Sequence, residues 1–193
     1  MSHLGPMSLW QSVAVVTAAA LPAPFAVAAT YLTTDGAQRA LFPEAQSFDD
    51  LKLAPSAAQQ RSILEAAGLQ APHGALRAWT ARRGAAVVGY VFVDEVVGRQ
   101  DFITYAVGID SAGKLRPVEI LEYRESHGGE IRNKRWLQQF NGRGDLGQLR
   151  FRTDIKNIAG ATLSSEHVTA GVRRILVLWE TLVKPGAALA AGR

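Results

Sequence analysis

Residues 85–97 read AAVVGYVFVDEVV, a run of β-branched and aromatic residues that is typical of a strand. Three further runs of this kind surround it in the chain: Leu76–Arg82, Phe102–Ile109 and Leu115–Tyr123. The connections between them are short and contain glycine, Arg83-Gly84 in one case and Asp110–Lys114 in another, as hairpin turns require. The sequence therefore predicts an antiparallel meander of about four strands.

Helical patterns lie on either side of these strands. Thr34–Phe42 reads as a short helix that Pro43 ends, and Lys134–Phe140 as another. A third helix is predicted from an N-cap at Ser56 through Ala67, with Gly68 as its C-terminal cap.

The clearest element is an amphipathic helix near the C-terminus, over residues 165–184. Its apolar residues recur every three or four positions: Val168, Val172, Ile175, Leu176, Trp179, Leu182 and Val183. Ser164 or Ser165 is expected to cap it, with Glu166 in its first turn. Helices, a run of strands and helices again predict an α+β fold, an antiparallel sheet meander with flanking helices and this C-terminal helix.

Length and composition exclude several classes of protein. The 193 residues suffice for one domain of ordinary size, and 48% hydrophobic with 20% charged residues is a normal globular composition. The chain has no cysteine, which rules out disulfides, thiolate chemistry and Cys-ligated metals. Its four histidines form no H-x-x-x-H pair, so we expect no metal site. Since no nucleophile and base pair and no nicotinamide motif is evident, a stand-alone enzyme is the least favoured interpretation.

The first 34 residues contain no Lys, Arg, Asp or Glu. Within them the apolar run of residues 9–21 is followed by two prolines and Ala26-Val27-Ala28, an A-x-A triplet that fits a signal-peptidase site. We therefore expect residues 1–28 to be a signal peptide or, alternatively, an N-terminal anchor. This places the protein in the periplasm or at the outer face of the cytoplasmic membrane, with one domain at 31–184 and a flexible tail at 185–193.

Positive charge is concentrated between Lys114 and Lys156. This segment holds ten basic and six acidic residues, a difference equal to the net charge of +4 of the whole chain. Such a surface suits anionic lipid, a phosphate-bearing ligand or an acidic partner protein, or is a solvated face without a specific partner. Nucleic acid is not expected for an exported protein.

The stretch that carries chemistry leads into the C-terminal helix: Gly160-Ala161-Thr162-Leu163-Ser164-Ser165. Gly160 and Ala161 let the backbone approach a ligand, and a helix N-terminus offers unpaired amide donors and the positive end of a dipole. These are the requirements of a phosphate site. Thr162 adds a hydroxyl at the same place. A small-residue turn into a helix, without a ligand, is the alternative.

This stretch resembles the S/T-G-A-T motif of the FMN-binding domain family, which includes the flavinylated C subunit of the sodium-translocating NADH:quinone reductase and the G subunit of the Rnf complex. The upstream stretches Val118–Glu130 and Trp136–Gly142, and Leu41–Ala45 near the start, are also similar to the family. The resemblance implies that FMN is the cofactor and that a flavin transferase attaches it to Thr162 through a phosphoester.

The resemblance also indicates residues around the flavin. Glu125, His127 and Gly128 occupy the position of a family loop that lies beside the ring, although Ser126-His127-Gly128-Gly129 stands where T-P-G-L is usual. Lys156 stands where the family usually has an acid, and is expected to neutralise the flavin phosphate. Ala159 replaces a usual Ser or Thr, and Asp154 lies two residues before Lys156. His127 is either a hydrogen-bond donor to the flavin or an ordinary loop histidine.

Three functions remain open at this point. The first is an exported electron-transfer flavoprotein with FMN on Thr162, which serves a membrane or periplasmic redox partner. The second is a noncovalent FMN-binding or cofactor-free module, favoured by Lys156 and Ala159. The third is an interaction module that docks through the basic surface. The first and third are compatible, because electron carriers commonly dock by charge.

Overall fold

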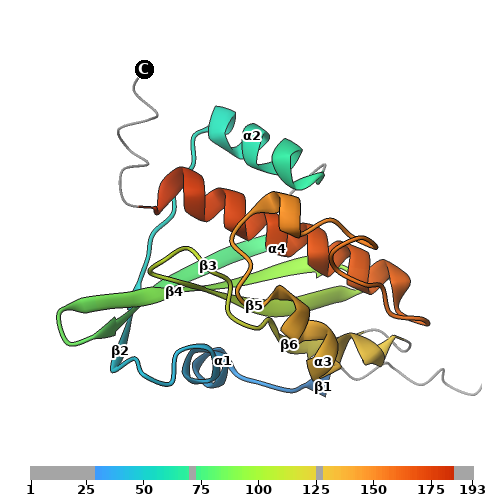
Figure 1. Ribbon diagram of the computed structural model, residues 1–193, viewed down its shortest axis with the longest axis horizontal. Helices are drawn as coiled ribbons and strands as arrows, with labels where there is room; N and C mark the ends of the chain where they lie inside the picture. Colours follow the sequence, from blue (N-terminus) through green and yellow to red (C-terminus); the bar gives the residue numbers. More distant parts are fainter. Residues whose placement is uncertain (1–28, 70–72, 125–127, 185–193) are drawn as a thin grey trace, which may run out of the picture.

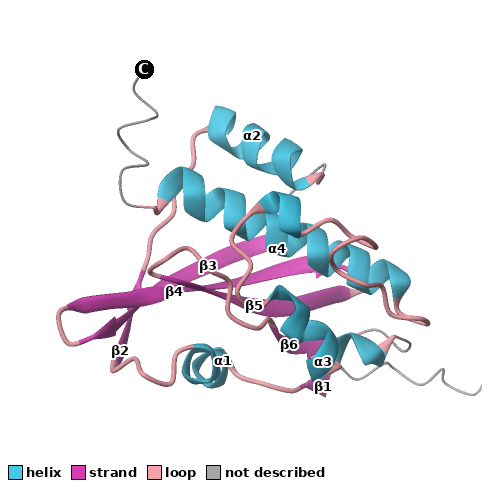
Figure 2. Ribbon diagram, viewed as in Figure 1, coloured by secondary structure: helices cyan, strands magenta, loops and turns pink. Residues whose placement is uncertain are grey.

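The computed structural model describes residues 29–69, 73–124 and 128–184, and its centre is a six-stranded antiparallel sheet (Figures 1 and 2). The strand order is β1-β6-β5-β4-β3-β2. In chain order the strands are β1 Ala29–Thr30, β2 Ser47–Asp50, β3 His73–Arg83, β4 Ala86–Val97, β5 Phe102–Asp110 and β6 Glu119–Tyr123. The α-helices are α1 Thr34–Leu41, α2 Ala57–Ala67, α3 Lys134–Leu137 and α4 Thr162–Leu182.

The predicted meander is confirmed as β3-β4-β5-β6, each strand antiparallel to the next. The two outer strands β1 and β2 were not expected, because each is too short to show a strand pattern in the sequence. The predicted strand over 115–123 is shorter than expected. Only Glu119–Tyr123 belongs to β6, and Leu115 makes an isolated bridge to Ile109. Pro117, which lies between Leu115 and β6, has no N–H to donate and interrupts the ladder.

Helices cover both faces of the sheet (Figure 1). One face packs against α4, with α2 lying outside α4, and the other packs against α1. The side chains of β4 point alternately to the two faces and so belong to two different cores. Val91 and Val93 belong to the core on the α1 side, and Phe92 and Val96 to the larger core under α4. Burial on both faces is why the strand reads as a nearly continuous apolar run.

The predicted helix ends agree with the structure for α2 and differ for α4. Ser56 forms a capping box with Gln59, and Gly68 ends α2 in a left-handed conformation with φ +77°. The prediction that Ser164 or Ser165 caps the C-terminal helix is wrong. α4 begins at Thr162, its N-cap is Ala161 and no side chain caps it, so both serines lie in the first turn, buried. Lys134–Phe140 is helical as predicted, but becomes a 3-10 helix from Gln138.

A buried ion pair fixes α4 on the sheet. The guanidinium Nη2 of Arg174 donates to Oδ1 of Asp94 on β4, and these side chains are 7% and 0% exposed. The Tyr105 hydroxyl of β5 donates to the other carboxylate oxygen of Asp94 at 2.5 Å. Burial, and then the charge of Asp94, raises the pKa of Tyr105 well above its ordinary value, so this donor keeps its proton.

Within the described part of the chain, no helix has the length and apolar character needed to cross a membrane. The same residues contain no group of three or more His, Cys, Asp or Glu side chains that could hold a metal ion.

Replacing Asp94 by Ala should reveal the value of this buried pair. The change leaves the Arg174 charge buried without its counter-ion, so the free energy of unfolding should fall by about 3–5 kcal/mol in urea denaturation. The matched control is Asp49→Ala, which removes the partner of Arg82 from a pair that is 56% and 38% exposed. That change should cost less than about 1 kcal/mol. Similar losses in both variants would contradict a special role for Asp94.

Candidate functional site

The N-terminus of α4 presents backbone donors to the surface. The first intrahelical hydrogen bond runs from the Ser165 N–H to the Ala161 carbonyl at 2.9 Å. The N–H groups of Thr162, Leu163 and Ser164 come before this bond, so the helix itself gives them no acceptor. Since no side chain caps the helix, these donors and the positive end of the helix dipole are available to an anion.

Thr162 is the first residue of α4 rather than part of the preceding turn. Its side chain is half-buried, and its hydroxyl donates a long hydrogen bond of 3.4 Å to the Ile158 carbonyl. Gly160, two residues earlier, has φ +86°, and a Cβ placed there would meet no atom within 4 Å. The backbone before the threonine is therefore turned sharply and left open on its outer side.

A hollow of about 370 Å³ lies at this end of α4. It is lined by Gly160, Ala161, Thr162, Leu163, Ser164 and Arg99. The sequence analysis named the first five of these as cofactor-binding residues, and the structure brings them together with Arg99 around one hollow. Leu163 is 48% exposed, an unusual position for a large apolar side chain in the first turn of a helix. Polar donors and an apolar surface thus lie next to each other.

Arg99 was not predicted, and it contributes the cation of this hollow. It lies in the turn between β4 and β5, 63 positions before Thr162 in the chain. The ring Nδ1 of His167, on α4, lies 2.5 Å from the Val97 carbonyl and 3.1 Å from that of Gly98, and so ties this turn to the helix. No local motif marks Arg99 or His167, because only the packing of α4 across β4 brings them to Thr162.

Gly128 lies against the same helix end. It has φ +89°, and a Cβ there would be 2.6 Å from the Tyr123 hydroxyl, 3.4 Å from the Ala161 Cβ and 3.6 Å from the Ser164 Oγ. Gly128 therefore lies beside Ala161 and Ser164, two residues that line the hollow. Glu125 and His127, predicted in the same loop, lie outside the described residues.

Lys156 lines a different hollow. This second hollow, of about 420 Å³, lies between α3 and the chain before Ile158, and Lys156 and Arg135 are its two cations. The backbone of Lys156 is fixed there, since its carbonyl accepts from Trp136 Nε1 at 2.5 Å and its N–H donates to Gln139 Oε1 at 3.0 Å. The two hollows share no lining residue. In this arrangement Arg99, rather than Lys156, is the cation beside Thr162.

Asp154 is engaged elsewhere as well. Its carboxylate accepts hydrogen bonds from the Arg150 backbone N–H at 3.0 Å and from Arg150 Nε at 2.8 Å. These bonds, the side-chain bond first, lower the pKa of Asp154. The Asp154 carboxylate thus stabilises the turn of residues 150–154.

The comparison with known families agrees with this geometry. Residues 98–177 match the model of the FMN-binding domain family, a segment that runs from the β4–β5 turn into α4 and includes Arg99, Gly128 and Thr162. Over this segment the chain is similar to the FMN-binding domain family, and FMN is the cofactor that the family indicates. No curated protein matches the chain.

The residues of the hollow fit one part of FMN well. Three amide donors and one guanidinium suit its phosphate, and the exposed face of Leu163 suits the apolar part of the molecule. The strands β1 to β4 precede the matched segment, yet they belong to the same sheet.

Replacing Gly128 by Ala should disturb the site more than the same change at Gly160. Both positions need a left-handed backbone, which costs an alanine about 1–2 kcal/mol. Only Gly128 adds a close contact, since its Cβ would meet the Tyr123 hydroxyl. We expect Gly128→Ala to lower the free energy of unfolding measurably more than Gly160→Ala in urea titrations. A smaller loss at Gly128 would mean that Gly128 does not lie against the Tyr123 hydroxyl.

Proposed function

We propose that this chain is an exported electron-transfer flavoprotein in which FMN is attached to Thr162 through a phosphoester. The observation that carries the proposal is the position of Thr162, which lines a hollow together with uncapped helix amides and a guanidinium, within a segment that matches the FMN-binding domain family. The family supports FMN binding and electron transfer. The phosphoester and the export are the steps that the proposal adds.

When bound, FMN supplies the redox chemistry, and the protein positions it. In the proposed attachment the Thr162 oxygen attacks the flavin-side phosphorus of a flavin dinucleotide. The phosphoanhydride bond breaks, a nucleoside monophosphate leaves, and the hydroxyl proton passes to solvent. We assign this reaction to a flavin transferase. The 3.4 Å bond from this hydroxyl to Ile158 is long, so little is lost when its proton leaves. The amides of Thr162, Leu163 and Ser164 remain to hold the phosphate oxygens.

Arg99 is the proposed counter-ion of that phosphate. A guanidinium matches a phosphate in shape, and charge-assisted hydrogen bonds are about twice as strong as neutral ones. His167 acts as a positioning residue, because its contacts with Val97 and Gly98 hold the turn that carries Arg99. Gly128 lets its loop lie against Ala161 and Ser164, because a side chain there would collide with the Tyr123 hydroxyl.

Export is proposed from the sequence at 1–28, a signal peptide or an anchor, and places the protein in the periplasm or at the outer face of the cytoplasmic membrane. A covalent tether suits that location, because FMN lost outside the cytoplasm is not easily replaced. A noncovalent FMN site remains the second candidate. It is favoured by Lys156 and Ala159, which stand where the similar family motif usually has an acid and a Ser or Thr.

The redox partner is proposed to be acidic where it docks. Arg135 and Lys156 are exposed and line one hollow, and neither has a carboxylate within ion-pair distance among the described residues. Ile158 lines the same hollow, and its carbonyl accepts from Thr162, so this surface lies close to the proposed flavin. Electrostatic attraction there would raise the association rate.

Thr162→Ala should abolish covalent FMN. The full chain is made in the periplasm together with a flavin transferase, and the intact mass is measured under denaturing conditions. The wild type should carry the mass of one FMN, and Thr162→Ala none, because the acceptor oxygen is gone. Thr153→Ala, at an exposed threonine outside the hollow, should keep the flavin. An unmodified mass of the wild-type protein would contradict covalent attachment and leave noncovalent FMN binding as the alternative.

Arg99→Ala should weaken binding of FMN but not of riboflavin, which lacks the phosphate. In the Thr162→Ala background, titration followed by flavin fluorescence should show a loss of FMN affinity of about three- to tenfold. Arg152→Ala removes an exposed cation that does not line this hollow, and should change neither affinity. An unchanged preference for FMN over riboflavin would remove Arg99 from the phosphate site.

Arg135→Ala and Lys156→Ala should slow electron transfer to an anionic acceptor. Oxidation of the reduced flavoprotein by ferricyanide should become slower and less dependent on salt, because two attractive charges are lost. Oxidation by hexaammineruthenium, a cation, should not become slower. Lys52→Ala serves as the control at an exposed lysine on another part of the surface. Equal slowing for both acceptors would point to a structural effect.

A further inference from the structure

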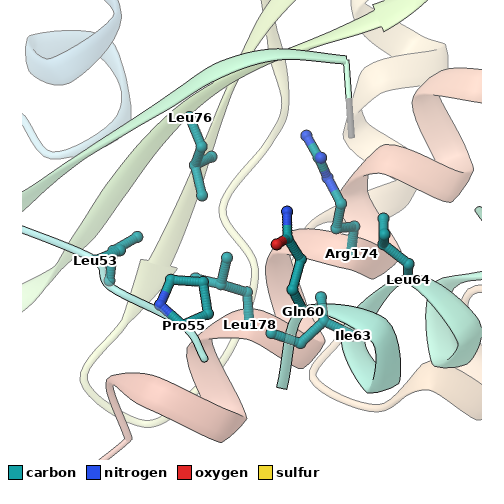
Figure 3. A pocket seen from close by; sticks show the side chains of 8 residues that line it. All are labelled: Leu53, Pro55, Gln60, Ile63, Leu64, Leu76, Arg174 and Leu178. Carbon is teal, nitrogen blue, oxygen red and sulfur yellow. The ribbon is translucent and has the colours of Figure 1, made fainter. Parts of the chain in front are cut away.

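A third hollow lies away from the proposed flavin, between α2, α4 and the start of β3 (Figure 3). Its volume is about 210 Å³. Its walls are mostly aliphatic, from Leu53, Pro55, Ile63, Leu64, Leu76 and Leu178, and its two polar residues are Gln60 and Arg174. Arg174 follows Thr162 by twelve positions on α4, a separation of roughly 18 Å along the helix. The hollow is thus separate from the flavin site.

The charge in its wall is already neutralised. Arg174 is paired with Asp94, and Asp94 also accepts from Tyr105, whose pKa is raised by burial so that it stays neutral. The three groups together carry no net charge. An anionic ligand would add a second negative charge to this buried cluster without a second cation, which is unfavourable at low polarity. A neutral ligand meets no such cost.

Polar contacts are available for one oxygen atom. The Gln60 side chain comes from α2 and lines the hollow, and Figure 3 shows its amide directed between Leu76 and Arg174. The Nε of Arg174 is buried and has no hydrogen-bond partner among the described residues. A buried donor without an acceptor is destabilising, so an acceptor brought by a ligand would be favourable here.

The helix that closes the hollow is lightly anchored. Of the residues of α2, only Ile63 and Ala67 are buried, and the segment of residues 51–56 before it has no regular structure. Arg173 adds one hydrogen bond, from its Nη2 to the Ala66 carbonyl at 3.1 Å. α2 can therefore adjust over a small ligand without disturbing the sheet beneath α4.

We propose that this hollow is a binding site for a small neutral molecule with an apolar body of about one ring and a single carbonyl or hydroxyl group. Size agrees with this class, since a dry aliphatic cavity of about 150 Å³ accommodates benzene. The apolar body would contact the leucines, and the oxygen would accept from the Gln60 amide and from the Nε of Arg174. This function is additional to the flavin site and does not depend on it.

The test uses the full chain and two fluorinated probes of almost the same shape, 4-fluoroacetophenone and 4-fluorobenzoate, followed by fluorine NMR. The ketone should bind saturably and the carboxylate at least about tenfold more weakly, because only the carboxylate brings an uncompensated charge. Bound ketone should also slow amide hydrogen exchange in α2 and leave exchange in α1 unchanged. Equal binding of both probes, or no saturable binding of the ketone, would overturn the proposal.

Two kinds of variant locate the site. Leu64→Trp should fill the hollow and abolish ketone binding, whereas Ala58→Trp, at an exposed position of the same helix that does not line the hollow, should not. If Leu64→Trp lowers stability too far, Leu53→Trp fills the hollow from the opposite segment. Gln60→Leu should weaken ketone binding about three- to tenfold. Ketone binding that persists in both filled variants would place the ligand elsewhere.

Discussion

The structure depends on how α4 is fixed along β4. Arg174 pairs with Asp94, and seven residues earlier His167 contacts the carbonyl of Val97, three residues after Asp94. Seven helical residues rise about 10.5 Å, and three strand residues about 10 Å, so the two contacts fit one antiparallel alignment of helix and strand. Gly171 lies between them, where a Cβ would collide with the Tyr105 hydroxyl, and its lack of a side chain lets the helix approach the sheet.

This alignment determines what surrounds each end of the helix. At the N-terminal end it brings the turn with Arg99 beside Thr162, and Gly128 approaches from the loop after β6. The proposed phosphate site therefore draws on three segments that are distant in the chain. The amides are supplied by the helix, the cation by a turn, and the free space by glycines, so no single segment could form the site alone.

Further along α4, the same ion pair has a different consequence. Arg174 is neutralised by Asp94 on the sheet side, while its side chain lines the hollow under α2. One helix thus borders a site suited to an anion at its start and a site suited to a neutral molecule about three turns later. Both sites depend on where α4 lies on the sheet. Changes in the core beneath α4 are therefore expected to alter ligand binding at both sites together.

The sequence by itself determined the elements with strong local signals. The β-branched and aromatic residues of 85–97, the capping residues Ser56 and Gly68, and the apolar stripe of the last helix all predict what the structure contains, because these patterns act through neighbours in the chain. The resemblance around Thr162 likewise indicated the family whose model matches residues 98–177. Local patterns failed where two choices were close: either serine could have capped α4, yet both are buried in its first turn.

Only the tertiary structure decided the rest. β1 and β2 are too short to be seen without the strands they pair with. Lys156 was expected beside the phosphate from its spacing, but its backbone is held by Trp136 and Gln139 in another hollow, and Arg99 stands by Thr162 instead. The partners of Asp94 and His167 lie about 70 to 80 residues away. Contacts between residues so far apart in the chain arise from the packing of α4 on the sheet. No local sequence pattern marks such pairs.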